Sequence, residues 1–285
     1  MLIDLFREHL DALARRKELL SSWFEDKREY LLKSHQLEGL LIMAAGDGKR
    51  MKSPGKPKPL LDYHGRPLIE HILEPALMQF DRQDVMVMIQ GDDSFAELQK
   101  HLDDKGVTVL YQASSVAKGY LSAFIKEFYL HWNSNVLRQY RKLAIFPADI
   151  VFEKEPDFKG MLSHMDNRNL VLVMANQEGS EGRMLLKKGH GDEKAGWLED
   201  FRAGKLKESQ KFEPAVHTGG FLINTDLLYN PLKLSPPVLA FLANKGSIAA
   251  KKIGYYFIDG KFEGINTPED LSRKPEWEIN KPLAP

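Results

Sequence analysis

The chain has 285 residues, of which 43% are hydrophobic, a size and composition that allow one large α/β domain and exclude wholesale disorder. Its 40 basic and 40 acidic side chains give a formal net charge of zero, which argues against a nucleic-acid-coating surface. Cysteine is absent, so disulfides, thiolate metal sites and cysteine nucleophiles are excluded.

The first segment, Leu2–Ser34, contains neither glycine nor proline, and its leucines recur at roughly helical spacing among mixed charges. This pattern predicts an N-terminal helical extension over residues 1–36, ahead of a main domain over residues 37–285. Two interpretations are equally favoured. The extension is an arm through which the chain forms a homo-oligomer or binds a partner, or it packs on the domain's own surface. We expect no chemistry there.

The run Gly39–Met43 is short, continuous and apolar, which predicts a buried parallel strand. Directly after it, Gly46 and Gly48 can take positive φ and let backbone N–H groups approach a ligand closely. Cations follow on the same loop: Lys49, Arg50, Lys52, Lys56 and Lys58. A strand end, a glycine turn and clustered positive charge together predict a site for an anion of triphosphate size.

Two other phosphate motifs do not fit this loop. The Walker motif needs Lys and Ser/Thr after its second glycine, whereas Lys49 and Arg50 follow Gly48. The dinucleotide fingerprint needs a third glycine where Met51 stands, so a hydride-transferring dehydrogenase is disfavoured. The remaining alternative is a basic surface loop interrupted by prolines.

The signature loop (residues 44–61) is much more specific than a lone Gly-x-Gly. Its sequence, Ala-Ala-Gly-Asp-Gly-Lys-Arg-Met followed by Lys-Pro-Lys-Pro-Leu-Leu, resembles that of the nucleotidyltransferases, which join a nucleoside triphosphate to a sugar 1-phosphate or a similar phosphate and release pyrophosphate. The resemblance implies that Arg50 and Lys58 are catalytic, and an arginine can clamp phosphate oxygens bidentately. It further implies that the nucleotide is bound by Ala44, Ala45, Gly46, Gly48, Lys49 and Lys56.

From Leu37 onward, predicted strands and helices alternate. The strands are Gly39–Ala44, Val85–Ile89, Val107–Tyr111, Lys142–Phe146, Leu170–Met174, Val216–Ile223 and Ile253–Ile258, and the helices are Pro67–Phe80, Ser94–Leu102 and Gly119–His131. This alternation predicts an α/β fold with a Rossmann-like, mainly parallel sheet and helices on both faces, as in nucleotide-diphospho-sugar transferases. Ligands then bind at the carboxyl ends of the strands. The charged stretch Glu178–Lys211 predicts short strands and mobile loops.

Asp149 ends the apolar run that begins at Lys142. Mg²⁺ prefers hard oxygen ligands, often one or two carboxylates together with substrate phosphates and water. The family places its metal-binding aspartate after such a strand, so the resemblance implies Asp149 as a Mg²⁺ ligand. The alternative is a capping or structural aspartate.

The stretch Phe262–Leu271 also resembles the family. Thr267 is a good N-cap with Pro268 at the first helical position, which predicts a helix start. Many sugar-phosphate members carry a second metal-binding aspartate where this chain has Gly264. Glu263 is therefore our second metal candidate. The alternatives are Asp259, an ion held by Asp149 with phosphates and water alone, or impaired activity.

Two further stretches carry weaker resemblances. Gln112 and Gly119 lie in a stretch that is similar to the family's base-reading element, but Tyr120 and Leu121 replace its Thr and Ala, so the base cannot be inferred. Thr218 and Gly219 resemble the turn that approaches the acceptor, whereas His217 is expected to be structural.

These observations predict a Mg²⁺-dependent nucleotidyltransferase that transfers a nucleotidyl group from a nucleoside triphosphate to a phosphorylated small-molecule acceptor. A sugar 1-phosphate is the leading acceptor. Residues 265–270 also resemble the molybdenum-cofactor nucleotidyltransferases, so the alternatives are molybdopterin or phosphocholine, or a non-catalytic nucleotide-binding module. A nucleotide substrate makes the cytoplasm the simplest location. The zero net charge predicts no nucleic-acid partner. We also predict no membrane partner, because no apolar stretch is long enough to cross a bilayer.

Overall fold

The structure is a computed structural model that describes residues 37–46, 48–51, 56–112, 124, 127, 136–165, 170–177, 183–191, 193–203, 213–225, 253–275 and 277. Three predictions fall outside this part of the chain: the N-terminal helical extension over residues 1–36, Gly119, and most of the helix predicted over residues 119–131.

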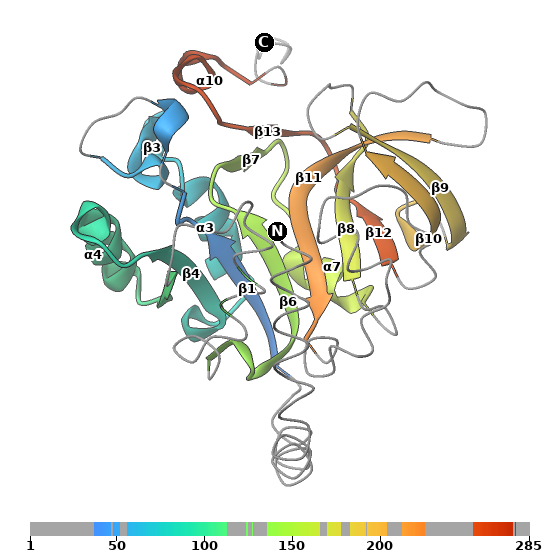
Figure 1. Cartoon of the computed structure of the whole chain (residues 1–285), viewed down its shortest axis with the longest axis horizontal. Helices are drawn as coiled ribbons and strands as arrows, with labels where there is room; N and C mark the ends of the chain where they lie inside the picture. Colours follow the sequence, from blue (N-terminus) through green and yellow to red (C-terminus); the bar gives the residue numbers. More distant parts are fainter. Residues whose placement is uncertain are drawn as a thin grey trace, which may run out of the picture.

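A nine-stranded sheet with the order β5-β4-β1-β6-β11-β8-β12-β10-β9 forms the centre of the molecule (Figure 1). β1, β4, β5 and β6 are mutually parallel, β8 and β12 run in the same direction, and β11 is antiparallel to its neighbours β6 and β8. The strands are β1 Leu37–Met43, β4 Val85–Gln90, β5 Thr108–Gln112, β6 Tyr140–Pro147, β8 Leu170–Ala175, β9 Arg183–Gly191, β10 Ala195–Ala203, β11 Glu213–Asn224 and β12 Ile253–Phe257. The predicted, mainly parallel sheet is thus confirmed.

Both faces of the sheet are buried, which explains why its strands are continuous apolar runs rather than alternating ones. Leu40 and Ile42 belong to a core cluster with residues of α3 Glu70–Leu77, α4 Ala96–Lys105 and α7 Phe158–Ser163. The opposite face is also inaccessible to solvent at its centre, where 0% of the side chain is exposed at Leu41, Met86, Met88, Leu143 and Ile145.

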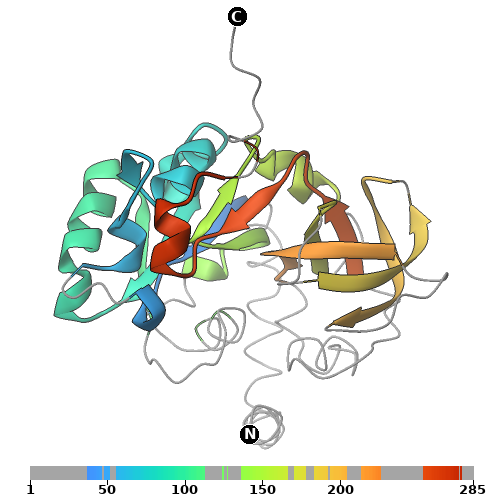
Figure 2. The same cartoon turned by 90° about the horizontal axis from the view of Figure 1, so that it is seen from above.

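The strands β9 and β10 correct the prediction of short strands between residues 178 and 211, because each is nine residues long. β9 pairs with β10 and also with the first half of β11, so the ladder returns on itself. The strands β11, β8, β12, β10 and β9 therefore form a closed ring beside the open parallel half (Figure 2, where β12 is red and the other strands of the ring run from yellow-green to orange). Ring closure removes an unpaired sheet edge.

Short elements complete the fold. A hairpin of β2 Asp62–Tyr63 and β3 Arg66–Pro67 delays the predicted helix at Pro67, so that α3 begins at Glu70. The others are η1 Lys49–Met51, η2 Lys58–Leu60, η3 Arg82–Asp84, η4 Asp93–Phe95, β7 Ile150–Phe152, β13 Phe262–Gly264 and α10 Pro268–Ser272. In the described part of the chain, no helix is both long and apolar enough to span a bilayer.

The predicted helix start at Thr267 is confirmed as a capping box on α10. The Thr267 side chain accepts a hydrogen bond from the Asp270 N–H, and the Asp270 carboxylate accepts one from the Thr267 N–H. β13 pairs with β7, which directly follows Asp149, and thereby brings α10 back to the parallel half of the molecule (Figure 1).

Candidate active site

Three chain segments meet where β1 and β6 end. The Ala148 N–H donates to the Met43 carbonyl oxygen at 3.1 Å, which ties the turn after β6 to the end of β1. The Ile265 N–H donates to the Asp149 carbonyl oxygen at 2.8 Å, which adds the segment after β13. Parallel strands present their carboxyl ends at one edge of a sheet, so the signature loop and Asp149 are neighbours.

The described part of the signature loop is anchored by an apolar residue within it. Met51 is 3% exposed and packs in a small cluster with Tyr63, Leu68, Val151 and Ile265. The turn of η1 is closed by the Met51 N–H, which donates to the Gly48 carbonyl oxygen at 2.7 Å, and Gly48 has φ +57°. The buried methionine fixes the turn, while the neighbouring Arg50 side chain stays exposed.

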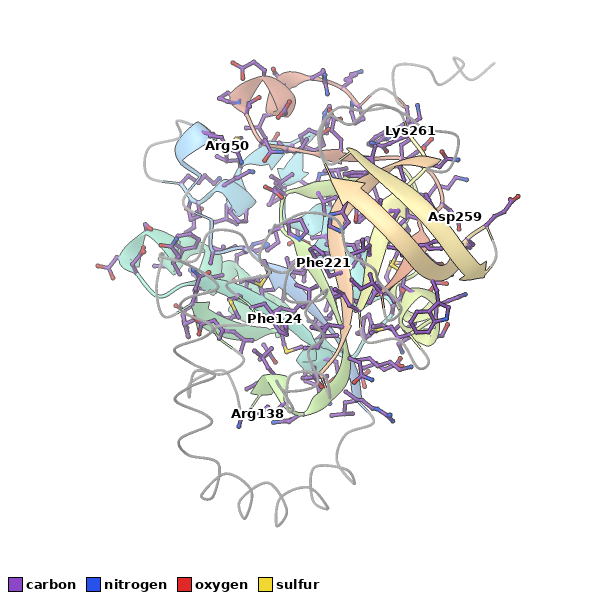
Figure 3. All side chains as sticks on the ribbon, turned by 45° about the vertical axis from the view of Figure 1, so that its right-hand side comes forward. Arg50, Phe124, Arg138, Phe221, Asp259 and Lys261 are labelled. Carbon is purple, nitrogen blue, oxygen red and sulfur yellow. The ribbon has the colours of Figure 1, made fainter. Side chains whose placement is uncertain are left out.

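Arg50 contacts the C-terminal segment. Its Nη2 donates to Asn266 Oδ1 at 3.2 Å, a contact between residues 216 positions apart (Figure 3 labels Arg50). The Asn266 N–H donates in turn to Asp270 Oδ2 at 2.8 Å. The capping box of α10 therefore positions the side chain that holds Arg50.

Lys58 pairs with Asp149. Lys58 Nζ lies 2.5 Å from Asp149 Oδ2, and the two side chains are 12% and 29% exposed. Lys58 is the first residue of η2, whose Pro59 carbonyl oxygen accepts from the Ile69 N–H at 2.9 Å. This arrangement fixes a cation of the signature loop and the Asp149 carboxylate side by side, within reach of solvent.

Asp149 retains free coordination capacity. Its Oδ2 is taken by Lys58, whereas its Oδ1 accepts no hydrogen bond from the described residues. One reachable carboxylate suits an ion such as Mg²⁺ that takes its other ligands from phosphates and water. The described residues contain no group of three or more His, Asp or Glu side chains that could hold a metal by themselves.

Glu263 lies one strand away, in register with Val151. Its Oε1 accepts from the Arg273 guanidinium, while its Oε2 is buried and has no hydrogen-bond partner among the described residues. Asp259 pairs with Lys194 at 2.8 Å and lies well away from Arg50 in Figure 3. Of these two alternatives to an aspartate at 264, only Glu263 is on β13, the strand that pairs with β7 directly after Asp149.

The first residues of the signature loop continue the ladder of β1. The buried Ala44 donates its N–H to the Met88 carbonyl oxygen at 2.8 Å. The Ala45 carbonyl oxygen accepts from Gln90 Nε2 at 2.6 Å, and Gly46 is exposed. Lys56 is exposed too, and the backbone of Lys49 forms the first residue of η1.

Gln112 ends β5 at the same edge of the sheet, where it is in register with Gln90 of β4. It is half-buried, and it stands two strands away from the signature loop in the order β5-β4-β1.

Thr218 and Gly219 lie on β11 near the end of β6. The β6–β11 ladder pairs Phe221 with Ile145, so the chain before Phe221 runs beside the residues that lead to Asp149. The buried Thr218 hydroxyl donates to the Val173 carbonyl oxygen at 2.9 Å and accepts from the Gly220 N–H at 2.9 Å. Gly219 has φ +88°, which marks a break in the β8–β11 register. The Thr218 hydroxyl thus holds this break in place.

His217 has a structural environment, as expected. Its Nε2–H donates to the Gly220 carbonyl oxygen at 3.1 Å, and its ring packs on that of Phe221. Desolvation by burial lowers the pKa of His217 to about 4, and the hydrogen bond to Gly220 offsets only part of this effect. The imidazole is therefore neutral near pH 7.

Sequence reasoning missed two residues of this site. Asn266 was named only within the stretch Phe262–Leu271 that resembles the family, with no role of its own, and Gln90 was not singled out at all. The available signal for Gln90 was a polar residue at the end of an apolar strand, the edge where ligands bind in parallel sheets. For Asn266, nothing local indicates a partner in a loop more than two hundred residues earlier.

A family model for the MobA-like NTP transferase domain matches residues 40–217 of this chain. No curated protein matches the sequence significantly.

Many solved structures share the fold. A Bacillus anthracis protein named as a candidate glucose-1-phosphate thymidylyltransferase, solved with sucrose, superposes with a TM-score of 0.59 at 16% identity, covering 87% of this chain and 98% of its own. UTP-bound UGPase from Acinetobacter baumannii superposes with a TM-score of 0.60 at 13% identity, covering 83% of this chain and 91% of its own. At such low identities the likeness establishes the fold.

Proposed function

Because the chain belongs to the family of MobA-like NTP transferase domains and is a nucleotidyltransferase, we propose that its acceptor is a sugar 1-phosphate. An acceptor phosphate oxygen attacks the α-phosphorus of a nucleoside triphosphate in line. The new P–O bond forms as the bond to the β-phosphate oxygen breaks, and pyrophosphate leaves with that electron pair. The cluster of Arg50, Lys58 and Asp149 at the carboxyl ends of β1 and β6 supports the transfer of a nucleotidyl group. The choice of a sugar 1-phosphate is supported by the fold shared with proteins named as a glucose-1-phosphate thymidylyltransferase and a UGPase.

Charge is the main obstacle to this reaction, because phosphate oxygens around the α-phosphorus repel an anionic nucleophile. Catalysis therefore depends on alignment and on neutralising the charge that develops. Arg50 supplies a planar fork of N–H donors for phosphate oxygens, and Lys58 supplies a compact positive charge. Both cations are held by partners, Asn266 and Asp149, so little reorganisation is needed when the substrates bind.

Mg²⁺ fits this donor set as an ion shared between the protein and the substrates. Asp149 would hold it through Oδ1, and Glu263 is the second candidate ligand through Oε2; neither oxygen has a hydrogen-bond partner in the part of the chain that the structure describes. When bound, the ion supplies positive charge that neutralises the phosphates. Lys58 keeps the Asp149 carboxylate oriented beside the signature loop.

The same chemistry on a different phosphate acceptor is the second candidate. It is favoured by Gly264, which stands where many sugar-phosphate enzymes carry an aspartate, and by the family model that the sequence matches. Both candidates predict the same roles for Arg50 and Lys58, and only the acceptor differs.

A pyrophosphate-release screen tests the proposal. The four ribonucleoside triphosphates and dTTP are combined with Mg²⁺ and with sugar 1-phosphates, phosphocholine or molybdopterin. We expect pyrophosphate to be released only when a particular sugar 1-phosphate is present. Release with phosphocholine or molybdopterin alone would establish the second candidate, and a folded protein that is silent with every pair would contradict both.

A further inference from the structure

Gln90 extends the pairing between β1 and β4 beyond the point where the backbones separate. Met43 and Met88 are the last residues in the β1–β4 register, and one further backbone bond joins the Ala44 N–H to the Met88 carbonyl oxygen at 2.8 Å. Gln90 Nε2 then donates to the Ala45 carbonyl oxygen at 2.6 Å. At Ala45 the hydrogen bond from β4 is therefore donated by a side-chain amide rather than by a backbone N–H.

This bond sets the orientation of the next peptide group. In a planar trans peptide the C=O and the following N–H point in opposite directions. Because the Ala45 carbonyl is held toward β4, the Gly46 N–H is directed away from β4, toward the side of β1 on which β6 leads to Asp149. The Gly46 N–H has no hydrogen-bond partner among the described residues.

The space at Gly46 is open. Gly46 is exposed, and a Cβ atom added there would meet no heavy atom within 4 Å. An oriented backbone N–H on the loop that carries Arg50 and Lys58 is a suitable donor for an anionic oxygen. Without Gln90, the peptide between Ala45 and Gly46 would be free to rotate, and its N–H would have to be ordered by the ligand at an entropic cost.

We infer that Gln90 is a positioning residue for the nucleotide: by holding the Ala45 carbonyl, it presents the Gly46 N–H to a phosphate oxygen of the bound nucleoside triphosphate. The inference rests on the proposed function for the identity of that ligand. Gln90 is on β4, outside the signature loop, and would therefore be a further residue that shapes the nucleotide site. It also gives a physical reason for a polar side chain at the end of β4.

The test compares Gln90→Leu with a matched control, Gln79→Leu. Gln79 also donates from its amide to a carbonyl oxygen, that of Pro156 at 2.7 Å, but it follows α3, away from the signature loop. Nucleotide affinity is measured by titration calorimetry with each triphosphate and Mg²⁺, and stability by thermal unfolding. We expect Gln90→Leu to raise the dissociation constant about tenfold, the scale of one lost hydrogen bond, and Gln79→Leu to leave it unchanged.

Two readouts separate positioning from a merely structural role. In Gln90→Leu, KM for the triphosphate should rise while KM for the acceptor stays within about twofold, a contrast that a general loss of stability would not produce. The Gly46 amide proton should shift downfield on nucleotide binding in the wild-type NMR spectrum and much less in the variant. If Gln90→Leu does not fold, Gln90→Glu keeps the shape, loses the donor and gives the same comparison.

The outcomes distinguish the inference from the proposed function. A folded Gln90 variant with wild-type triphosphate affinity would overturn the role of Gln90 and leave the enzyme assignment intact. A wild-type protein that binds none of the triphosphates would instead overturn the proposed function. An equal loss of triphosphate affinity in Gln79→Leu would show that the effect of Gln90→Leu comes from general destabilisation, and it would overturn the positioning role of Gln90.

Discussion

Arg50 is exposed and makes its contact with Asn266 at the surface, so its replacement should affect catalysis much more than folding. We predict that Arg50→Ala lowers kcat about 100-fold or more, the scale of losing one donor to transition-state charge. Arg82→Ala, at the amino end of β4, removes another exposed arginine and should leave kcat unchanged. Steady-state pyrophosphate release measures both, and an unaltered kcat in Arg50→Ala would remove Arg50 from the mechanism.

The two candidate metal ligands can be separated by Mg²⁺ titration of activity. Asp149→Asn removes the carboxylate charge beside Lys58 and should raise the Mg²⁺ concentration for half-maximal activity at least about tenfold. Glu263→Gln should raise it to a similar degree only if Glu263 shares the ion. A Glu263→Gln enzyme with the wild-type Mg²⁺ profile would leave Asp149 as the only one of these two carboxylates that holds the ion.

Two features of the structure favour glycine at position 48. Its φ of +57° is unfavourable for other residues, and a Cβ atom would lie 3.3 Å from Lys58 Cβ. We predict that Gly48→Ala lowers the free energy of unfolding by about 1 kcal/mol and also lowers activity by displacing Lys58. Gly46→Ala, where the added atom meets nothing within 4 Å, should leave the free energy of unfolding unchanged. Urea denaturation of both variants measures the contrast.

At the scale of elements, the capping box of α10 links helix formation to the site. Partial burial raises the pKa of Asp270, but its hydrogen bonds from the Asn266 and Thr267 N–H groups outweigh burial, and the pKa lies below its usual value. The carboxylate therefore stabilises the fold above the unfolded-state pKa, and this contribution is lost as pH falls through the lower folded-state value.

Replacement of Asp270 should thus have two consequences. We predict that Asp270→Ala lowers the free energy of unfolding by about 1 kcal/mol at pH 7 and also lowers kcat, because Asn266 is no longer held against Arg50. Asp157→Ala removes the comparable cap of α7, where Asp157 accepts from the Gly160 N–H at 2.8 Å, and should reduce stability alone. Equal kcat values in the two variants would contradict the link between α10 and Arg50.

At the scale of the whole molecule, His217 makes stability depend on pH. Its folded-state pKa of about 4 lies below the unfolded value of 6.5, so between these pH values the unfolded chain binds more protons. The free energy of unfolding should therefore fall on acidification from pH 6.5 toward 4, by up to about 1.4 kcal/mol per pH unit from this group. His217→Gln keeps a donor for Gly220 and removes the titration, so its stability profile should be flatter. Chemical denaturation across this pH range measures both profiles, and parallel curves would contradict the assignment.

Much of the sheet was predictable. The strands around residues 40, 87, 110 and 145 in the open half, and the strand around residue 172 in the ring, follow from short apolar runs. The start of α10 follows from Thr267 and Pro268. The length of β9 and β10 was missed, because charged strands that pair within a ring lack the apolar signal of a doubly buried strand. The hairpin at residues 62–67 was missed because each of its strands has only two residues, too few to show a period. The signature loop was identified, since its glycines, cations and prolines are close in sequence.

The amino-acid sequence by itself determined the class of chemistry, because phosphate binding after a buried strand depends on residues within one loop. It also determined the alternation of strands and helices, which local periodicity encodes. Only the tertiary structure decided that Lys58 lies against Asp149 and Arg50 against Asn266, pairs that are 91 and 216 positions apart. Such contacts depend on how β1, β6 and β13 align at one edge of the fold, and alignment is a property of the packed sheet rather than of any local segment.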